Sequence, residues 1–375
     1  MRLDPFSKKN FELKRNDAKP LQDAKPLQED APLRALIDAL PDAIFLIDMG
    51  ERVAAANPAA RVLLPTLREG EPLARSLRAP DVLDALGRVL ETGRAEKSLW
   101  IERLPVESWF EALIAPLRVE GYAPAAMIAL RDLTEARRVE RMRADFVANA
   151  SHELRTPLAS LLGFVETLQG PARDDPKARE RFLGIMREQT QRMARLVDDL
   201  LSLSRIEQHQ HLRPETPVDL TMLVAHICDT LAPMAEDTGL SLDVDIAPNV
   251  ITPGDRDELA RVLENLIENA IKYGRPDGVE QGKIRVTLVA TGREAIFSVQ
   301  DNGPGIAAEH IPRLTERFYR VDAGKSRAKG GTGLGLAIVK HIVLRHRGKL
   351  TIDSAPGMGA RFRVNLPCLR PDAEA

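Results

Sequence analysis

The sequence predicts a multidomain α+β protein, and three observations support that prediction. The chain has 375 residues, which is enough for two or three domains of ordinary size. Short apolar runs separated by turn signals fill residues 31–134, as in a mixed α/β domain. Residues 135–208 carry a helical heptad pattern, and residues 218–368 alternate helices with strands.

The composition excludes several classes of protein. Hydrophobic residues make up 44% of the chain and charged residues 29%, which is typical of globular proteins and not of disordered ones. The net charge of -2 gives no global reason to expect a nucleic-acid partner. Cys228 and Cys368 are too few for a disulfide framework or a cysteine-based zinc site, so a reducing, cytoplasmic location is expected.

The N-terminal residues 1–30 are predicted to form a flexible tail. They are polar and contain a direct repeat of DAKPLQ at residues 17–22 and 23–28. The first fifteen residues hold five basic and two acidic side chains, so weak attraction to anionic lipid at the inner face of the membrane is the alternative. No window reaches the 18 consecutive apolar residues of a membrane span, and any membrane association is expected to be indirect.

Residues 31–134 contain short apolar runs in the order two strands, helices, three strands. The strands are expected at residues 43–48, 52–56, 98–104, 109–119 and 125–133. This order resembles the PAS sensor fold, and the closing RDLTE at residues 131–135 resembles the exit from a PAS domain into a signalling helix. The absence of cysteine and histidine from residues 31–135 argues against a flavin–cysteinyl photosensor and a histidine-ligated haem sensor. The ligand stays open, with dimerisation alone as the alternative role.

Residues 135–208 are predicted to form a signalling helix and a two-helix hairpin. The first helix runs to about residue 168, and a break at residues 170–176 contains glycine and two prolines. Apolar residues in the second helix recur with heptad spacing, and a hairpin with such a seam cannot bury its apolar face alone. We therefore expect a homodimeric four-helix bundle. The seam consists of Phe182, Met186, Gln189, Met193, Leu196, Leu200 and Leu203.

The first helix contains the string SHELRTPL at residues 151–158. Helical geometry turns His152 away from the apolar face, with Thr156 one turn further along. Glu153 lies on the flank, where a carboxylate can hold or deprotonate an imidazole. Pro157 lacks an N–H, so the helix can kink there. A single surface histidine is usually only solvated, but the whole string argues for chemistry.

The string resembles the phosphoacceptor box of sensor histidine kinases. The resemblance implies that His152 is phosphorylated on a ring nitrogen and that Glu153 assists as a base. It also implies that Thr156 positions water when the phosphorylated partner, a response regulator, is dephosphorylated.

Three further motifs suggest a nucleotide site. A helix at residues 257–273 places Asn265, Asn269 and Lys272 on one face, where amides and an ammonium can take Mg²⁺ and phosphate; a solvated polar face is the alternative. DNGPG at residues 301–305 follows a strand and suits a carboxylate that accepts from an exocyclic amine; a plain type II turn is the alternative. GGTGLGL at residues 330–336 precedes a helix expected at 337–345 and presents N–H groups to an anion.

A dinucleotide-binding fold is the rival explanation of the glycine run. Asp353 lies 22 residues after Gly331, as that fold requires. The glycines, however, follow a basic segment at residues 323–329 instead of an apolar strand, and their spacing is G-x-G-x-G. The context therefore contradicts the rival.

Together with ERFYR at residues 316–320 and GMG at 357–359, these motifs resemble the N, G1, F, G2 and G3 boxes of the histidine-kinase ATPase domain, an α/β sandwich shared with gyrase-type ATPases. The resemblance implies that Asn269 binds Mg²⁺ with Asn265 nearby, that Lys272 contacts phosphate, and that residues 321–329 form a lid over ATP. An asparagine at position 265, where hydrolytic relatives keep a glutamate, favours phosphoryl transfer. The implied ATP-binding residues are Asn265, Asn269, Lys272, Tyr273, Asp301 (which reads the adenine amine), Gly303, Gly305, Gly331, Thr332, Gly333, Leu334 and Gly335.

The chain is thus expected to be a sensor histidine kinase that phosphorylates His152 with ATP and transfers the phosphoryl group to an aspartate of a response regulator. FVETL at residues 164–168 and the PAS-like arrangement resemble the phosphate-regulon sensor kinases, which suggests a role in phosphate starvation. Those kinases normally carry N-terminal membrane helices. The alternatives are a net phosphatase of the regulator and a catalytically dead, PAS-driven dimer scaffold.

Overall fold

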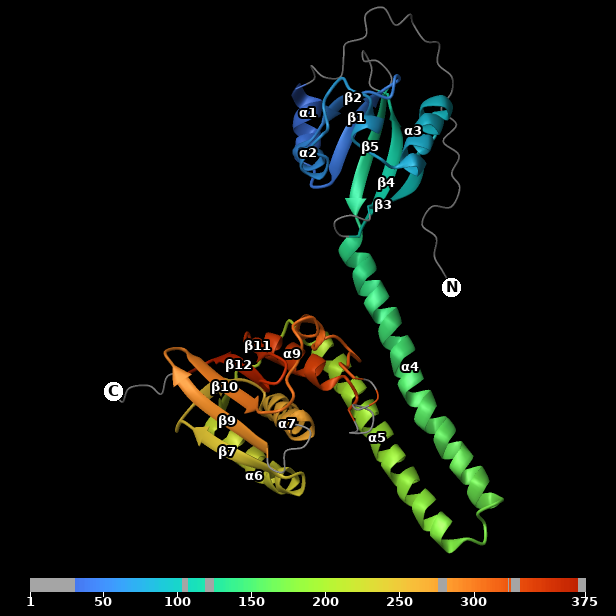
Figure 1. The fold of residues 1–375 in the computed structure, drawn as a ribbon. Coiled ribbons are helices and arrows are strands. Elements are labelled where there is room, and N and C mark those ends of the chain that lie inside the picture. Colours follow the sequence, from blue (N-terminus) through green and yellow to red (C-terminus); the bar gives the residue numbers. More distant parts are fainter. Residues whose placement is uncertain are drawn as a thin grey trace, which may run out of the picture. The chain divides into compact units, whose positions relative to one another are not determined.

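The computed structural model describes residues 31–102, 107–118, 125–275, 282–322, 324 and 331–369. The chain divides into two compact units, Met1–Asp145 and Phe146–Ala375. Each unit contains a five-stranded β-sheet (Figure 1), and the second unit also contains a short two-stranded one. The predicted tail at residues 1–30 and most of the predicted lid at 321–329 lie outside the described residues.

A five-stranded antiparallel sheet is the centre of the first unit. Its strand order is β2-β1-β5-β4-β3, so the last strand along the chain pairs with the first. The strands follow the predicted order, and their bounds differ from the expected ones by a few residues. The elements are α1 (Ala31–Asp38), β1 (Ala43–Asp48), β2 (Val53–Ala56), α2 (Pro58–Leu63), the 3-10 helix η3 (Leu73–Arg75), α3 (Pro80–Thr92), β3 (Glu96–Glu102), β4 (Ser108–Leu117) and β5 (Ala125–Asp132).

Apolar side chains cover both faces of this sheet. Val82, Leu86 and Val89 recur at helical spacing on α3 and are buried in a core that includes one face of the sheet. On the other face, Ile37 of α1 lies in a smaller cluster with Ile44 of β1. The second face is covered only in part, because Leu99, Ile101 and Leu113 of β3 and β4 are exposed.

The hairpin of the second unit belongs to α4 (Thr134–Gln169) and α5 (Pro176–Gln208). Asp175 caps α5 by accepting from the backbone N–H groups of Lys177 and Ala178, and Pro176 occupies the first turn. Phe164 and Phe182 stack across the two helices with ring centroids 5.3 Å apart. α4 is continuous through Pro157, so the residue at which a kink was predicted does not end the helix. All seven predicted seam positions of α5 are buried or half-buried.

A mixed five-stranded sheet in the order β11-β12-β10-β9-β7 completes the second unit, with β7 and β9 parallel. Helices α6, α7 and α9 share one hydrophobic core with this sheet, and Leu196, Leu203 and Ile206 of α5 join the same core. The elements are β6 (Pro217–Asp219), α6 (Leu220–Asp237), β7 (Leu240–Ile246), β8 (Ile251–Pro253), α7 (Arg256–Tyr273), β9 (Gly282–Thr291), β10 (Glu294–Asp301), the 3-10 helix η4 (Ile311–Arg313), α9 (Gly335–Arg345), β11 (Lys349–Ser354) and β12 (Ala360–Pro367).

None of the described helices combines the length and the apolarity that crossing a bilayer requires.

Candidate functional site

Helix α7 carries the two asparagines and the lysine predicted to contact nucleotide. Asp255 caps the helix through the N–H groups of Asp257 and Glu258, and one apolar face of the helix is buried in the core. Asn265 donates from Nδ2 to the carbonyl of Arg261 at 2.8 Å, which leaves its side-chain oxygen toward the start of α9. A Cβ at Gly335 would lie 2.4 Å from that oxygen, so a larger residue there would require the Asn265 side chain to move.

Asn269 and Lys272 differ in how they are engaged. Within the described part of the chain, the half-buried Asn269 side chain forms no hydrogen bond. Its amide oxygen therefore fits a magnesium site, because Mg²⁺ prefers oxygen ligands and keeps several waters. Lys272 instead forms an ion pair with Glu268 at 2.5 Å, one turn earlier. A contact of Lys272 with phosphate would compete with this pair.

Asp301, at the end of β10, is 8% exposed. Its Oδ1 accepts hydrogen bonds from the backbone N–H of Gly303 at 2.9 Å and of Ala360 at 3.1 Å. Burial raises the pKa of this carboxyl, and the two backbone donors oppose that rise.

Tight glycine contacts surround Asp301. A Cβ at Gly303 would lie 2.6 Å from the carbonyl oxygen of Tyr273, and one at Gly359 would lie 2.1 Å from the carbonyl oxygen of Asp301. The fold thus brings Tyr273, Asp301, Gly303 and the 357–359 glycines together. Gly305 has φ of +72° and lies against the carbonyl of Ala355. Ala355 belongs to the turn between β11 and β12.

The glycine run adjoins the ERFYR segment. Gly333 has φ of +74°, and a Cβ there would lie 2.9 Å from the Phe318 Cα. The Phe318 N–H donates to the Gly333 carbonyl at 2.8 Å. α9 begins at Gly335, two residues before the predicted start, and Leu334 is fully buried with its N–H 3.3 Å from Thr332 Oγ1. Gly331 and Thr332 are half-buried just before this turn.

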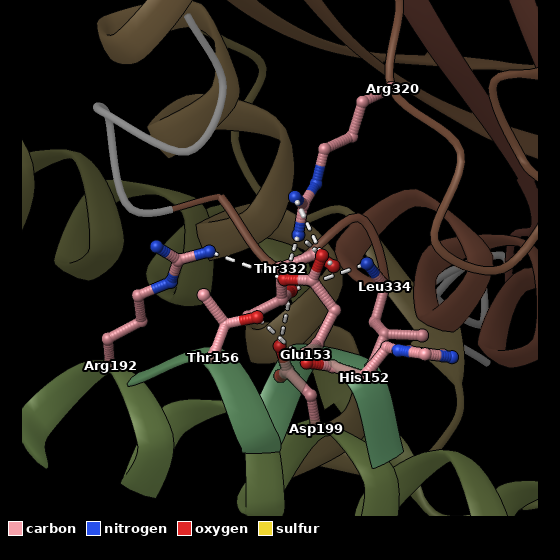
Figure 2. Close-up of polar contacts among 8 residues, drawn as sticks. All are labelled: His152, Glu153, Thr156, Arg192, Asp199, Arg320, Thr332 and Leu334. Carbon is pink, nitrogen blue, oxygen red and sulfur yellow. Dashed lines mark hydrogen bonds and ion pairs between the residues drawn. The ribbon is translucent and has the colours of Figure 1, made fainter. Parts of the chain in front are cut away.

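His152, Glu153 and Thr156 lie together on α4, and Figure 2 shows their surroundings. His152 is exposed, as predicted, and its ring points away from the polar contacts of Glu153. Thr156 is also exposed, and its hydroxyl donates to the His152 carbonyl at 3.2 Å.

The structure directs the Glu153 carboxylate toward two arginines instead of toward the His152 ring (Figure 2). Arg320 donates through Nη2 and Nη1 at 3.1 and 3.3 Å, and Arg192 of α5 donates at 3.3 Å. The Arg320 side chain is only 6% exposed, and its Nη2 also donates to the Thr332 carbonyl at 2.8 Å. Arg320 therefore links the residue beside His152 to the glycine run.

Two further carboxylates, both on α5, contact the ATPase-like part of the unit. Asp199 accepts from Arg261 at 2.7 Å and from the Thr332 hydroxyl at 2.8 Å (Figure 2 shows the latter). Glu207 pairs with Arg317 at 2.5 Å and lies 3.6 Å from His341 Nε2. Burial lowers the pKa of His341, so this imidazole is predominantly neutral at pH 7. We call Glu153, Asp199 and Glu207 the hairpin carboxylates.

We did not predict Arg192, Arg320 or the α5 members of the hairpin carboxylates as site residues. The only local signal was the ERFYR segment itself, which contains Arg317 and Arg320. Glu153 and Arg320 are 167 residues apart along the chain, and no periodic pattern connects them.

Three family descriptions match the chain. Residues 37–138 match the PAS fold, residues 142–209 match the His Kinase A (phospho-acceptor) domain, and residues 254–370 match the histidine kinase-, DNA gyrase B- and HSP90-like ATPase. These matches confirm the predicted fold class, in which a PAS-like domain, a phosphoacceptor hairpin and an α/β-sandwich ATPase follow one another. They also confirm ATP as the nucleotide class.

Characterised proteins resemble the chain over most of its length. It is 37% identical over 346 residues to the phosphate regulon sensor protein PhoR of Pseudomonas aeruginosa, which covers 89% of this chain and 75% of that protein. It is 33% identical over 345 residues to the sensor protein kinase WalK of Staphylococcus saprophyticus, covering 90% of this chain but 55% of WalK. Among solved structures, Acinetobacter baumannii histidine kinase AdeS covers 58% of this chain and 97% of its own, with 26% identity and a TM-score of 0.46. The predicted resemblance to phosphate-regulon sensors is confirmed, and the chain belongs to the sensor histidine kinases of two-component systems, which are ATP-dependent protein-histidine kinases.

Proposed function

We propose that ATP phosphorylates His152 and that the phosphoryl group then passes to an aspartate of a response regulator. The observation that carries this proposal is the position of His152, which is exposed on α4 within the SHELRTPL string. The same compact unit contains the ATPase-type domain that would supply the phosphoryl group. An exposed imidazole is accessible both to a bound nucleotide and to a second protein.

The nucleotide roles follow from the geometry around α7 and β10. Asp301 would accept the adenine amine, because its buried carboxylate still has oxygen acceptor capacity beyond the bonds from Gly303 and Ala360. Asn269 would hold Mg²⁺, which neutralises phosphate charge during phosphoryl transfer, and Asn265 would lie alongside. Lys272 would exchange Glu268 for a phosphate oxygen. The N–H groups at the start of α9 would contact the phosphates.

The contacts of the hairpin carboxylates indicate that the ATPase-type domain is docked on the hairpin in a resting arrangement. Glu153 is engaged by Arg192 and Arg320, and Thr332 of the glycine run is bonded to Asp199. Before Glu153 can assist His152 as a base, its carboxylate has to leave both guanidinium groups. Transfer therefore follows release of the ATPase-type domain from the hairpin.

The chain would act as a homodimer with a cognate response regulator. Leu158 and Leu162 of α4 and Leu201 of α5 are between 53% and 60% exposed, although each is large and apolar. A second hairpin would bury them in a four-helix bundle. The similarity to PhoR supports a role in phosphate-starvation signalling.

The direct test is incorporation of label from γ-labelled ATP. We expect His152→Ala to bind ATP with unchanged affinity and to take up no label. His211→Ala, which removes another exposed histidine, should be labelled like the unaltered protein. Label on the His152 variant would contradict the assignment.

A net phosphatase is the second candidate function, and the exposed Thr156 hydroxyl one turn from His152 favours it. Thr156→Ala should leave autophosphorylation intact and prolong the lifetime of the phosphorylated regulator severalfold. If the regulator loses phosphate at the same rate with both proteins, Thr156 has no part in dephosphorylation.

A further inference from the structure

The first unit contains a cavity of about 480 Å³ that the kinase reaction does not use. Residues 63–66 at the end of α2, together with Ser76 and Arg78 after η3, form part of its wall, and the rest comes from β3 and β4. This volume lies within the range of about 300–1,000 Å³ that is typical of small-molecule sites. The cavity is therefore large enough for a compact organic ligand.

Two aromatic rings form an apolar wall of the cavity. Trp100 and Phe110 are paired across β3 and β4, with ring centroids 4.8 Å apart and an interplanar angle of 26°. They are 7% and 6% exposed and belong to the main core of the unit. In the part of the chain that the structure describes, the Trp100 indole N–H forms no hydrogen bond and remains accessible to solvent. The wall suits an apolar side chain and still offers one donor.

Two opposite charges line the same cavity. Arg78 and Glu102 are both exposed, and neither forms an ion pair with the described residues. Other arginines of the unit do pair, as Arg61 does with Glu69 and Arg88 with Glu96. A cation and a carboxylate that share one cavity without joining each other are complementary to a ligand that carries both charges.

We propose that this cavity binds a free amino acid with an apolar side chain. The ligand carboxylate would lie against Arg78 and its ammonium group against Glu102, while its side chain would cover Trp100 and Phe110. A ligand with only a negative charge would meet an uncompensated Glu102, and one with only a positive charge would meet an uncompensated Arg78. The proposal goes beyond the kinase reaction, because it gives the sensor unit a class of ligand.

Tryptophan fluorescence of the full chain provides the test, since the protein contains two tryptophans, Trp100 and Trp109. Trp109→Phe leaves Trp100 as the reporter in the cavity wall. We expect saturable fluorescence changes with L-leucine and L-phenylalanine. Phenethylamine and 3-phenylpropionate, which each lack one charge, should bind at least about tenfold more weakly, because each loses one charge-assisted contact.

In that background, Arg78→Gln and Glu102→Gln should each weaken amino-acid binding by about tenfold or more. Arg94→Gln and Glu91→Gln change exposed residues of the same unit outside the cavity lining and should leave binding unchanged. The proposal is overturned if neither amino acid gives saturation up to about 10 mM. It is equally overturned if a single-charge analogue binds as tightly as L-phenylalanine. Labelling of His152 is measured separately, so failure here leaves the kinase assignment standing.

Discussion

Asp301, the proposed adenine contact, illustrates how a buried ionisable side chain lowers the stability of a fold. It is buried at the end of β10, and burial raises its pKa even though two backbone N–H groups donate to its carboxylate. A carboxyl with a raised pKa in the folded state contributes its full stability only below the pKa of the unfolded chain, about 3.9. That contribution is lost as the pH rises through the folded-state pKa, so at neutral pH the ionised carboxylate weakens the domain.

We therefore predict that Asp301→Asn stabilises the protein at neutral pH while it removes nucleotide binding. The amide oxygen can keep the bonds from Gly303 and Ala360, and the burial penalty of the charge disappears. The gain should be about 1 kcal/mol at pH 7 and should shrink toward pH 4, which thermal unfolding across this range can measure.

Asp245→Asn makes the same chemical change at an exposed position of β7 and is the matched control. Its unfolding temperature should follow that of the unaltered protein at every pH. A gain for Asp301→Asn that does not vary with pH would show that ionisation of Asp301 is not its cause.

At the scale of elements, the contact between the hairpin and the ATPase-type domain combines an apolar part with a charged part. The apolar part includes Phe146 of α4 and Phe318, whose ring centroids are 5.9 Å apart. The charged part consists of the hairpin carboxylates, each bonded to an arginine. Such part-buried pairs contribute little net stability, because desolvation offsets much of the attraction.

Removing one partner lowers the stability by more than the intact pair contributes, because the other charge stays buried without a counter-charge. In Glu153→Gln, the 6% exposed Arg320 side chain would lose its carboxylate. We predict a loss of about 1–3 kcal/mol in the free energy of unfolding, measured by urea denaturation. Glu166→Gln, at an exposed position of α4, should unfold like the unaltered protein. Equal urea midpoints for the two variants would rule out a stabilising role for the Glu153 contacts.

The same elements show what the sequence can predict. The hairpin was predictable because its heptad spacing is a local pattern, and every seam position proved buried or half-buried. The close backbone approaches at the glycine motifs were predictable because glycine permits them, as at Gly333, where a Cβ would lie 2.9 Å from the Phe318 Cα. The partners of Glu153 were not predictable, since charged residues make up 29% of the chain and none of the intervening spacing is periodic. Although Glu153 is adjacent to His152 in the sequence, its carboxylate contacts Arg192 and Arg320 instead of the imidazole.

At the scale of the whole molecule, each unit has a core of its own. The hydrophobic clusters of the first unit are built from residues 37–130, and the cluster of the second unit is built from residues 196–366. No residue of the described chain belongs to clusters of both units. A domain with its own core unfolds as a cooperative unit.

We therefore predict two unfolding transitions in calorimetry, of which ATP with Mg²⁺ shifts only one. A ligand that binds only the folded state stabilises it by about 2.7 kcal/mol at a hundred times its Kd, and the proposed nucleotide residues all lie in the second unit. Both tryptophans lie in the first unit, so tryptophan fluorescence should follow the transition that ATP does not move. Asp301→Asn, which would lack the proposed adenine contact, should show no shift with ATP. The contrary result is a single calorimetric transition that shifts with ATP and coincides with the change in tryptophan fluorescence. That result would mean that the two cores unfold as one cooperative unit.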